Sequence, residues 1–398
     1  MLLKALNKIL YLSFLVIDLM KLRITKKGIK NFFTITIPIV LVMLVFLEII
    51  FRTVIPAGHH PYFELYDEGG YVIGKYNHKN GVDGIKTFGA FARTKSYWKI
   101  NNHGWNAAID YQFEKVDSTT FRIAVIGDSY VEALNLDVDK SFVSNLNKSL
   151  NNIEVYSFGI GGSPMSQYMH FCRYVEKMYA PDAYIFVLAN NDIDESWAQY
   201  GEFRNLVLST NDLGNIIEHH PQYYEISQGK FTTLAKKSAL VRYMFYNLQI
   251  YRIARLLRFH FNPDKLPKGV VKPKKVHSTK EMIKDVSTYI FEEIEKTTDQ
   301  KQVLFVQDGD RANVYKLKPN DTKLMELVTV TKNLCDSLNY GYIYLFPIFE
   351  RDFKQNKTRF NTAADYHWNE YAHSLIADTL SSYILREFNA IKQDTISN

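Results

Sequence analysis

The chain has 398 residues, of which 46% are hydrophobic and 23% charged, with 19 Gly and 11 Pro. This composition is that of a folded globular protein, and it excludes a disordered chain, a collagen-like repeat and a small disulfide-stapled domain. The net charge of +6 lies entirely in residues 1–30, which carry seven Lys or Arg and one Asp. The rest of the chain is neutral, so no nucleic-acid partner is expected.

An apolar segment follows this basic N-terminus. Residues 32–51 read FFTITIPIVLVMLVFLEIIF, with Glu48 as the single charge. Twenty helical residues at about 1.5 Å each span about 30 Å, the thickness of the bilayer core. The pattern predicts a transmembrane helix over residues 31–52. A buried core helix of this length would carry a polar stripe, which this segment lacks. A cleaved signal peptide would be followed by an A-x-A cleavage site, and none follows here.

The flanking charges predict an orientation. Lys and Arg crowd residues 21–30, whereas residues 52–62 hold only Arg52 as a fixed positive charge. The positive-inside rule then places residues 1–30 in the cytoplasm and the rest of the chain outside, in the periplasm. Residues 2–20 are mostly apolar with polar groups near one helical face, which is typical of a helix in the membrane interface. A second hydrophobic segment packed against the span is the alternative.

The exported part divides into two regions. Residues 57–118 are rich in Gly, Tyr, Asn and His and predict a small β-rich ancillary region. In residues 119–392, short apolar runs alternate with helical patterns. The expected strands are residues 122–126, 153–158, 183–188, 302–306 and 342–346. The expected helices are residues 142–150, 166–178, 280–296, 323–337 and 370–388. Continuously apolar strands separated by helices predict a doubly wound, three-layer α/β/α domain with a parallel sheet.

An insertion over residues 193–280 interrupts this domain after the third strand. It contains an aromatic, basic helical segment at residues 240–261, followed by a Pro/Lys-rich loop at residues 263–275. An insertion of this length indicates a cap or docking element. Its aromatic side chains fit a sugar-stacking surface, the buried face of a cap, or a membrane-facing surface.

Two cysteines, Cys172 and Cys335, are the only thiols. They can pair in an exported protein, but both lie in helix-like apolar runs, which predicts buried free thiols. Neither belongs to a C-x-x-C or C-x-x-H pattern, so no metal site and no metal or organic cofactor are expected.

Polar residues follow the first two predicted strands. The first runs into Gly127-Asp128-Ser129, where a tight turn and a helix N-terminus expose a serine at the edge that binds ligands in doubly wound sheets. An N-cap is the plain alternative. The second strand runs into the glycine-rich residues 159–163, whose N–H groups can face an oxyanion or simply form a turn.

Two further signals lie at the same edge. The third strand ends in Asn190-Asn191-Asp192, where an Asn amide can donate to an oxyanion or close an Asx turn. Asp365 and His367 precede the last helix, and a carboxylate beside a histidine suits a general base. Together the four signals supply a nucleophile, oxyanion donors, a base and an orienting acid.

These blocks resemble the SGNH (GDSL-type) hydrolase superfamily over residues 121–391. The resemblance implies that Ser129 is the nucleophile and His367 the base. It also implies that Asp365 is the partner of the base, while the Gly162 backbone and the Asn191 side chain are oxyanion donors.

Two departures from the family pattern stand out. The third block is usually G-x-N-D, but Ala189 replaces the glycine here. The last block is usually D-x-x-H, but Asp365 lies only two residues before His367. This spacing, with Trp368 and Asn369 following, is similar to membrane-linked polysaccharide O-acetylation proteins such as those of alginate acetylation. His373 is a weaker candidate for the base.

The sequence therefore predicts a membrane-anchored, extracytoplasmic serine esterase or O-acyltransferase. The resemblance implies a cell-surface glycan carrying acyl, above all acetyl, esters as substrate, and a polysaccharide-modification machinery as partner. Two alternatives remain open. One is a non-catalytic binding or assembly protein of a polysaccharide export system. The other is a lipid or thioester hydrolase with the insertion as its lid.

Overall fold

The computed structural model describes residues 26–79, 82–115, 117, 119–197, 204–223, 236–250, 280–316, 322–363 and 365–388. The predicted interfacial helix at residues 2–20 and the loop at residues 263–275 lie outside the described residues. So does the part of the aromatic segment that follows residue 250.

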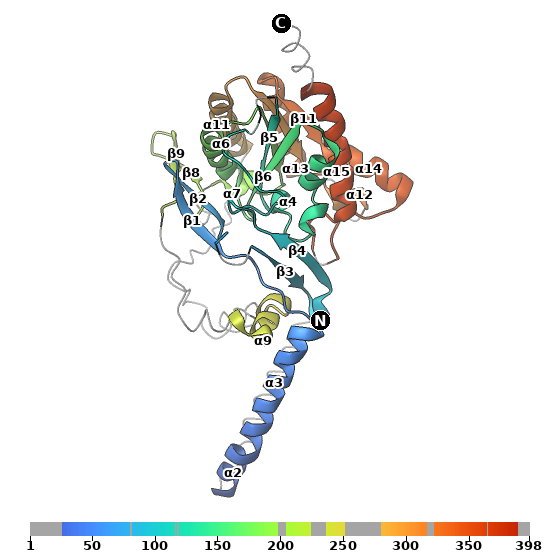
Figure 1. Cartoon of the computed structure of the whole chain (residues 1–398). Helices are drawn as coiled ribbons and strands as arrows, with labels where there is room; N and C mark the ends of the chain where they lie inside the picture. The colour runs from blue at the N-terminus through green and yellow to red at the C-terminus, as the bar shows by residue number, and fades with distance from the viewer. Residues whose placement is uncertain are drawn as a thin grey trace.

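A five-stranded parallel sheet forms the centre of the molecule (Figure 1). Its strands are β5 (Phe121–Gly127), β6 (Ile153–Gly159), β7 (Ala183–Leu188), β10 (Gln302–Gln307) and β11 (Gly341–Tyr344). Their order, β11-β10-β7-β5-β6, is that of the flavodoxin-like doubly wound fold. The fold class predicted from the sequence is confirmed. From β5 the chain adds β6 on one side and then β7, β10 and β11 on the other, so the order of strands switches between β5 and β7.

Helices cover both faces of this sheet because alternate side chains of each strand point to opposite faces. Ala124 and Ile126 pack with α6 (Met165–Tyr179), α11 (Lys280–Thr298) and α13 (Thr322–Ser337). Ile123 and Val125 face the other side. That face is covered by α5 (Phe142–Ser149), α14 (Leu345–Asn356), α15 (Glu370–Tyr383) and the π-helical η5 (Ile384–Phe388). The result is three layers.

One predicted element ends differently. The strand expected over residues 342–346 stops at Tyr344, and Leu345 begins helix α14. Tyr344 makes no side-chain capping hydrogen bond at this boundary, and the apolar run continues into the helix, so the local signals for a helix start are missing. Leu345 and Phe349 pack in the core beside α15.

The ancillary region contains two antiparallel hairpins. They are β1 (Phe63–Glu68) with β2 (Tyr71–Tyr76), and β3 (Asp83–Phe88) with β4 (Thr94–Lys99). The Tyr111 ring stacks on Tyr156 at 4.0 Å, and the Tyr111 hydroxyl accepts a 2.6 Å hydrogen bond from the Ser157 N–H. These contacts with β6 join the region to the α/β core.

The described part of the insertion is short, and both cysteines lie in the α/β core. The described part of the insertion contains the hairpin β8 (Val207–Thr210) and β9 (Ile216–His219), then α9 (Ala239–Arg242) and the π-helical η4 (Tyr243–Asn247). Cys172 and Cys335 are buried free thiols, as predicted.

The N-terminal elements project from the body as one helix (Figure 1). They are α2 (Lys26–Asn31), the π-helical η1 (Phe32–Thr36) and α3 (Ile37–Thr53). By length and composition this 28-residue helix can cross a membrane, and the apolar window within it is not buried by the rest of the protein.

Candidate active site

The sheet places Ser129 between two loops. Gly127, the last residue of β5, lies opposite Gly159 of β6 and Val187 of β7, so the loops that follow these strands leave the same edge side by side. Short helices follow β5, β7 and β10: α4 (Ser129–Glu132), α7 (Asp192–Glu195) and α12 (Arg311–Val314). Asp128 caps α4 by accepting a 2.9 Å hydrogen bond from the Tyr130 N–H. The approach is close: a Cβ on Gly159 would lie 2.4 Å from a backbone nitrogen of α4.

A serine, a histidine and an aspartate come together at this edge. His367 Nε2 lies 2.8 Å from Ser129 Oγ, and His367 Nδ1 lies 3.0 Å from Asp365 Oδ2. The second contact is short, yet the Nδ1–H is not aligned on the carboxylate as a hydrogen bond. Contacts of this kind often tighten only when substrate binds. The structure thus brings together the three residues that the sequence predicts for the roles of nucleophile, base and acid.

The Asp365 carboxylate is held by donors from three places. Oδ1 accepts hydrogen bonds from the His367 N–H at 3.0 Å and the Thr362 hydroxyl at 2.6 Å, and Oδ2 accepts one from Asn135 at 3.1 Å. Burial favours the neutral acid, but the close imidazole and charge of His367, its backbone N–H and the Thr362 hydroxyl outweigh burial, so the pKa of Asp365 lies well below its usual range. Asp365 is therefore ionised wherever His367 works.

The two-residue spacing from acid to base has a local explanation. Because Oδ1 of Asp365 accepts the backbone N–H of His367, the chain folds back on itself, and Oδ2 reaches the imidazole of the same residue. This turn places the exposed Tyr366 between the two functional residues.

A buried ion pair supports that turn from behind. Arg311 donates to Asp308 Oδ1 at 2.5 Å and to the Tyr366 carbonyl at 2.5 Å. The Trp368 indole N–H also donates to Asp308 Oδ1, at 3.0 Å, and Tyr130 donates to the Tyr366 carbonyl at 3.3 Å. Burial raises the pKa of Asp308 against the opposing charge of Arg311. The network fixes residues on both sides of His367, which orients its ring toward Ser129.

The ancillary region also reaches the site. Lys86 of β3 donates to Asn135, the residue that donates to Asp365. Burial lowers the pKa of Lys86, while the charges of Glu132 and Asp365 oppose that shift. The amine of Lys86, from the β3–β4 hairpin, therefore lies near the acid of the candidate triad.

The glycine-rich loop offers the Gly162 N–H to a ligand. The Gly161 N–H donates to Glu132 Oε1 at 2.8 Å, and Tyr76 donates to the same oxygen. The Gly162 N–H makes no hydrogen bond to a described residue, and its φ of 77° lies in the left-handed region that favours glycine. This arrangement suits Gly162, rather than Gly161, as the oxyanion donor.

A buried acid holds the turn that carries Asn191. Asp192 Oδ2 accepts the Ala189 N–H at 2.6 Å and the Tyr168 hydroxyl at 2.7 Å. Asn190 and Asn191 are both exposed, and neither side chain is bonded to another described residue. Both amides are thus open to a ligand at the edge beside Ser129, and the choice of Asn191 stays a prediction.

Two buried carboxyl groups flank the serine. Burial raises the pKa of Asp128 to about 6, with the Tyr130 N–H, His367 and Ser129 opposing the shift. Burial and the charge of Asp128 raise the pKa of Asp192 well above its ordinary value. Burial beside Asp128 thus favours the neutral form of the Asp192 carboxyl at the Asn191 turn.

His373, the second histidine considered as a base, has a structural role. It is buried in α15, and its Nδ1 accepts the Phe142 N–H at 3.1 Å. Burial, aided by the charge of His367, lowers its pKa to about 3.

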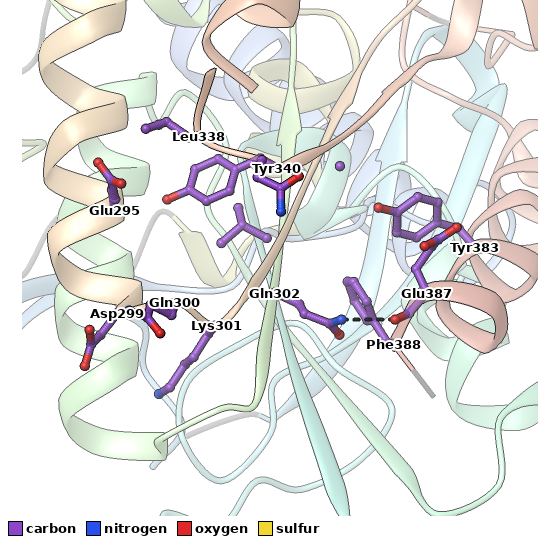
Figure 2. Close-up of a pocket in the computed structure, with 13 residues that line it drawn as sticks. Glu295, Asp299, Gln300, Lys301, Gln302, Leu338, Tyr340, Tyr383, Glu387 and Phe388 are labelled. Atoms are coloured by element: carbon purple, nitrogen blue, oxygen red, sulfur yellow. Dashed lines mark hydrogen bonds between the residues drawn. The ribbon is translucent and has the colours of Figure 1, made fainter. Parts of the chain in front are cut away.

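The pocket in Figure 2 lies away from these residues. It has a volume of about 690 Å³ and is lined by Gln302 and Gly341, which begin β10 and β11, so it opens at the opposite edge of the sheet. Gln302 donates to the Glu387 carbonyl there at 3.0 Å. Among the described residues, no group of three His, Cys, Asp or Glu is arranged to hold a metal ion.

Several residues that build the site carry no signal in the sequence. Asn135, Arg311, Glu132 and Lys86 are ordinary polar residues whose partners lie far along the chain. Only Thr362 had a usable signal, because a Thr three residues before an Asp is a frequent turn pattern.

Comparison with known proteins gives likenesses of fold. No protein-family model matches the chain, and no curated protein matches it. Among solved structures it is similar to a lipolytic G-D-S-L family protein from Veillonella parvula, at 12% identity and a TM-score of 0.39, covering 67% of this chain and 100% of that one.

Two further solved structures are similar over the same share of the chain. One is a lipase/acylhydrolase from Enterococcus faecalis, at 12% identity, a TM-score of 0.35 and 95% of that chain covered. The other is a mutant of Axe2, an acetyl-xylooligosaccharide esterase from Geobacillus, at 11% identity, a TM-score of 0.36 and 94% of that chain covered. The alginate-acetylation branch stays a prediction. Because identities and TM-scores are low, the function rests on the geometry around Ser129.

Proposed function

We propose that the protein is a serine esterase or O-acyltransferase that works through an acyl-Ser129 intermediate. One observation carries the proposal: His367 Nε2 lies 2.8 Å from Ser129 Oγ while its other nitrogen faces Asp365, whose carboxyl stays ionised. A serine with a base in hydrogen-bond reach, itself oriented by an acid, is an activated nucleophile.

The reaction follows from these positions. Ser129 Oγ attacks the ester carbonyl carbon as its proton moves to His367 Nε2, and Asp365 stabilises the imidazolium that forms. The N–H groups of Ser129 and Gly162 and the Asn191 amide hold the tetrahedral oxyanion. When the intermediate collapses, the leaving alcohol takes the proton from His367. Water or a sugar hydroxyl then attacks the acyl carbon and gives its proton to His367. The bond between Ser129 Oγ and the acyl group breaks, and Oγ takes that proton back from His367.

For the substrate we favour acetyl esters of cell-surface glycans. The D-x-H spacing of Asp365 and His367, with the tryptophan that follows, supports this choice, as does an apolar helix that can hold the enzyme at a membrane. In this proposal α3 spans the membrane, the basic residues before it stay in the cytoplasm and the α/β domain lies outside.

The test of the chemistry uses the full chain in detergent micelles, treated with a fluorophosphonate and weighed as intact protein beside Ser129→Ala. We expect one adduct on the wild type and none on the variant. A folded wild type that takes no adduct would contradict the activated serine and favour a binding or assembly protein.

A series of synthetic esters then tests the substrate. We expect acetyl esters to be turned over fastest. A preference for long acyl chains would instead indicate a lipid or thioester hydrolase.

The orientation is tested by labelling Leu213→Cys in spheroplasts with a maleimide that cannot cross the membrane. Leu213 is exposed in the β8–β9 turn, whereas Cys172 and Cys335 are buried. Labelling without lysis is expected, and labelling only after lysis would contradict an extracytoplasmic domain.

A further inference from the structure

The segment 238–247 is bound to the end of the apolar helix. The Glu48 carboxylate of α3 accepts hydrogen bonds from the Ala239 and Leu240 N–H groups, each at 2.9 Å, and from the Ser238 hydroxyl at 2.7 Å. These bonds satisfy the N-terminus of α9. They place the start of α9 beside Glu48, only a turn and a half before α3 ends at Thr53.

Further contacts hold the segment along the last turn of α3. The Phe51 ring stacks on Tyr243 at 3.9 Å, and Arg52 donates to the Lys237 carbonyl at 2.9 Å. Figure 1 shows α9 beside the top of α3, at the end of the body from which the helix projects. If α3 spans a membrane, α9 and η4 therefore lie at its outer surface.

The helical segment formed by α9 and η4 has one buried face and one exposed apolar face. Ala239, Tyr243 and Asn247, spaced four apart, are buried against the body. The opposite face carries Val241, Phe245 and Leu248, all exposed, with the Phe245 side chain 47% accessible. A surface helix normally presents polar residues to water on that face. Three apolar side chains at helical spacing indicate that this face meets something other than water.

A second exposed aromatic ring belongs to the same end of the molecule. Phe91 lies at the tip of the β3–β4 hairpin, and its N–H donates to the Tyr243 hydroxyl at 3.0 Å. It is 77% exposed, and its φ of 58° is uncommon for an aromatic residue. The hairpin thus presents an exposed aromatic side chain next to η4, at the same end of the molecule.

We infer that Phe91, Val241, Phe245 and Leu248 form a membrane-facing surface that inserts into the outer headgroup–acyl boundary of the bilayer that α3 spans. This inference rests on the proposed membrane span. The occupant is identified by continuity, because the surface adjoins the end of the apolar helix. Aromatic and aliphatic side chains suit this boundary, and the exposed Lys237 beside it can meet lipid phosphates.

The surface gives the catalytic domain a second attachment to the membrane. A single helix leaves a domain free to tilt, whereas the helix together with a docked face holds it in one orientation. The candidate triad is then kept at a fixed height above the bilayer.

The test places a bimane fluorophore on single introduced cysteines of the full chain in lipid nanodiscs. The native thiols are buried and stay unlabelled. Phe245→Cys reports on the surface, with Leu248→Cys as a second variant. Leu213→Cys, 84% exposed in the β8–β9 turn, reports on water, and Val42→Cys in α3 reports on the span. Quenchers are lipids with a nitroxide near the headgroup or deep in the acyl chain, and aqueous iodide.

We expect shallow nitroxide lipids to quench most of the emission at positions 245 and 248, and iodide to quench it only at position 213. Quenching at position 245 by iodide alone would overturn the inference. Protection there from both iodide and lipid would also overturn it, since protein would then cover the face. Failure of deep nitroxide lipids to quench position 42 would contradict the span itself, and that result is distinguishable from the others.

Discussion

Carboxyl groups are buried at the carboxyl edge of the sheet, whereas aromatic and aliphatic side chains are exposed at the end of α3. Asp128, Asp192 and Asp308 are almost wholly inaccessible, and Phe91 and Phe245 are open to solvent. Each arrangement reverses the usual distribution of polar and apolar groups. In the first region hydrogen bonds offset the cost of burial, which is typical of catalytic sites. In the second region apolar side chains stay exposed, which is typical of a binding surface.

Removal of the nucleophile is expected to have the largest effect. Ser129→Ala is expected to lower ester turnover by a factor on the order of 10⁵ to 10⁶, because it removes the one hydroxyl that is hydrogen-bonded to His367 Nε2 among the described residues. Turnover of a chromogenic ester measures the loss. Ser163→Ala, which removes a buried hydroxyl from the glycine-rich loop, is the matched control. Equal rates in Ser129→Ala and wild type would show that the nucleophile lies elsewhere.

The acid comes next. Asp365→Asn is expected to lower kcat by about 10⁴-fold, since a neutral amide no longer stabilises the imidazolium or selects the tautomer of His367. Loss of kcat with a near-normal KM in steady-state kinetics is the expected pattern. A variant that keeps wild-type kcat would make Asp365 a structural residue of the turn.

Substitutions of the two exposed asparagines test which of them donates to the oxyanion. Asn191→Ala is expected to lower kcat by about 10²- to 10³-fold, the usual cost of one oxyanion donor. Asn190→Ala, the matched control, should change it little. The reverse result would move the donor to Asn190, and two unaffected variants would remove this turn from the mechanism.

Asp128, the buried acid before Ser129, is expected to make the stability of the protein depend on pH. The pKa of Asp128 rises from 3.8 to about 6 on folding, so near pH 5 the folded protein keeps a proton that the unfolded chain has lost. Its contribution to stability is fully present below about pH 4 and is lost as the pH rises through 6.

Asp128→Asn removes this titration and keeps a capping side chain. Relative to wild type, its free energy of unfolding should improve by about 3 kcal/mol between pH 4 and 7. Thermal unfolding across that range measures the difference. If the free energies of unfolding of the variant and the wild type differed by the same amount at every pH, burial would not raise the pKa of the Asp128 carboxyl.

The membrane end is expected to give the smallest change. In detergent, Phe245→Ala should alter the free energy of unfolding by no more than about 0.5 kcal/mol, because its ring is exposed. Phe51→Ala, the control, should cost about 3 kcal/mol, since its buried ring stacks on Tyr243. A large loss for Phe245→Ala would show that this face packs within the protein, and the contrast between the two regions would fail.

Much of the architecture could be predicted from local patterns. The strand at residues 183–188 has the predicted bounds, and the helices near 142–150 and 166–178 end within one residue of them. The exception is the strand expected to end at residue 346. There Leu345 and Phe346 are equally suited to a buried strand and to the first turn of α14, so periodicity could not place the boundary.

The sequence by itself determined the apolar helix, the parallel sheet and the residues that meet at Ser129, because each depends on neighbours in the chain or on parallel strands ending at one edge. Only the tertiary structure decided which groups hold them. Arg311 reaches the Tyr366 carbonyl, Asn135 reaches Asp365, and Glu48 reaches α9 across 192 positions of sequence. Contacts this distant leave no periodic pattern, since they form only after the sheet and its helices have packed.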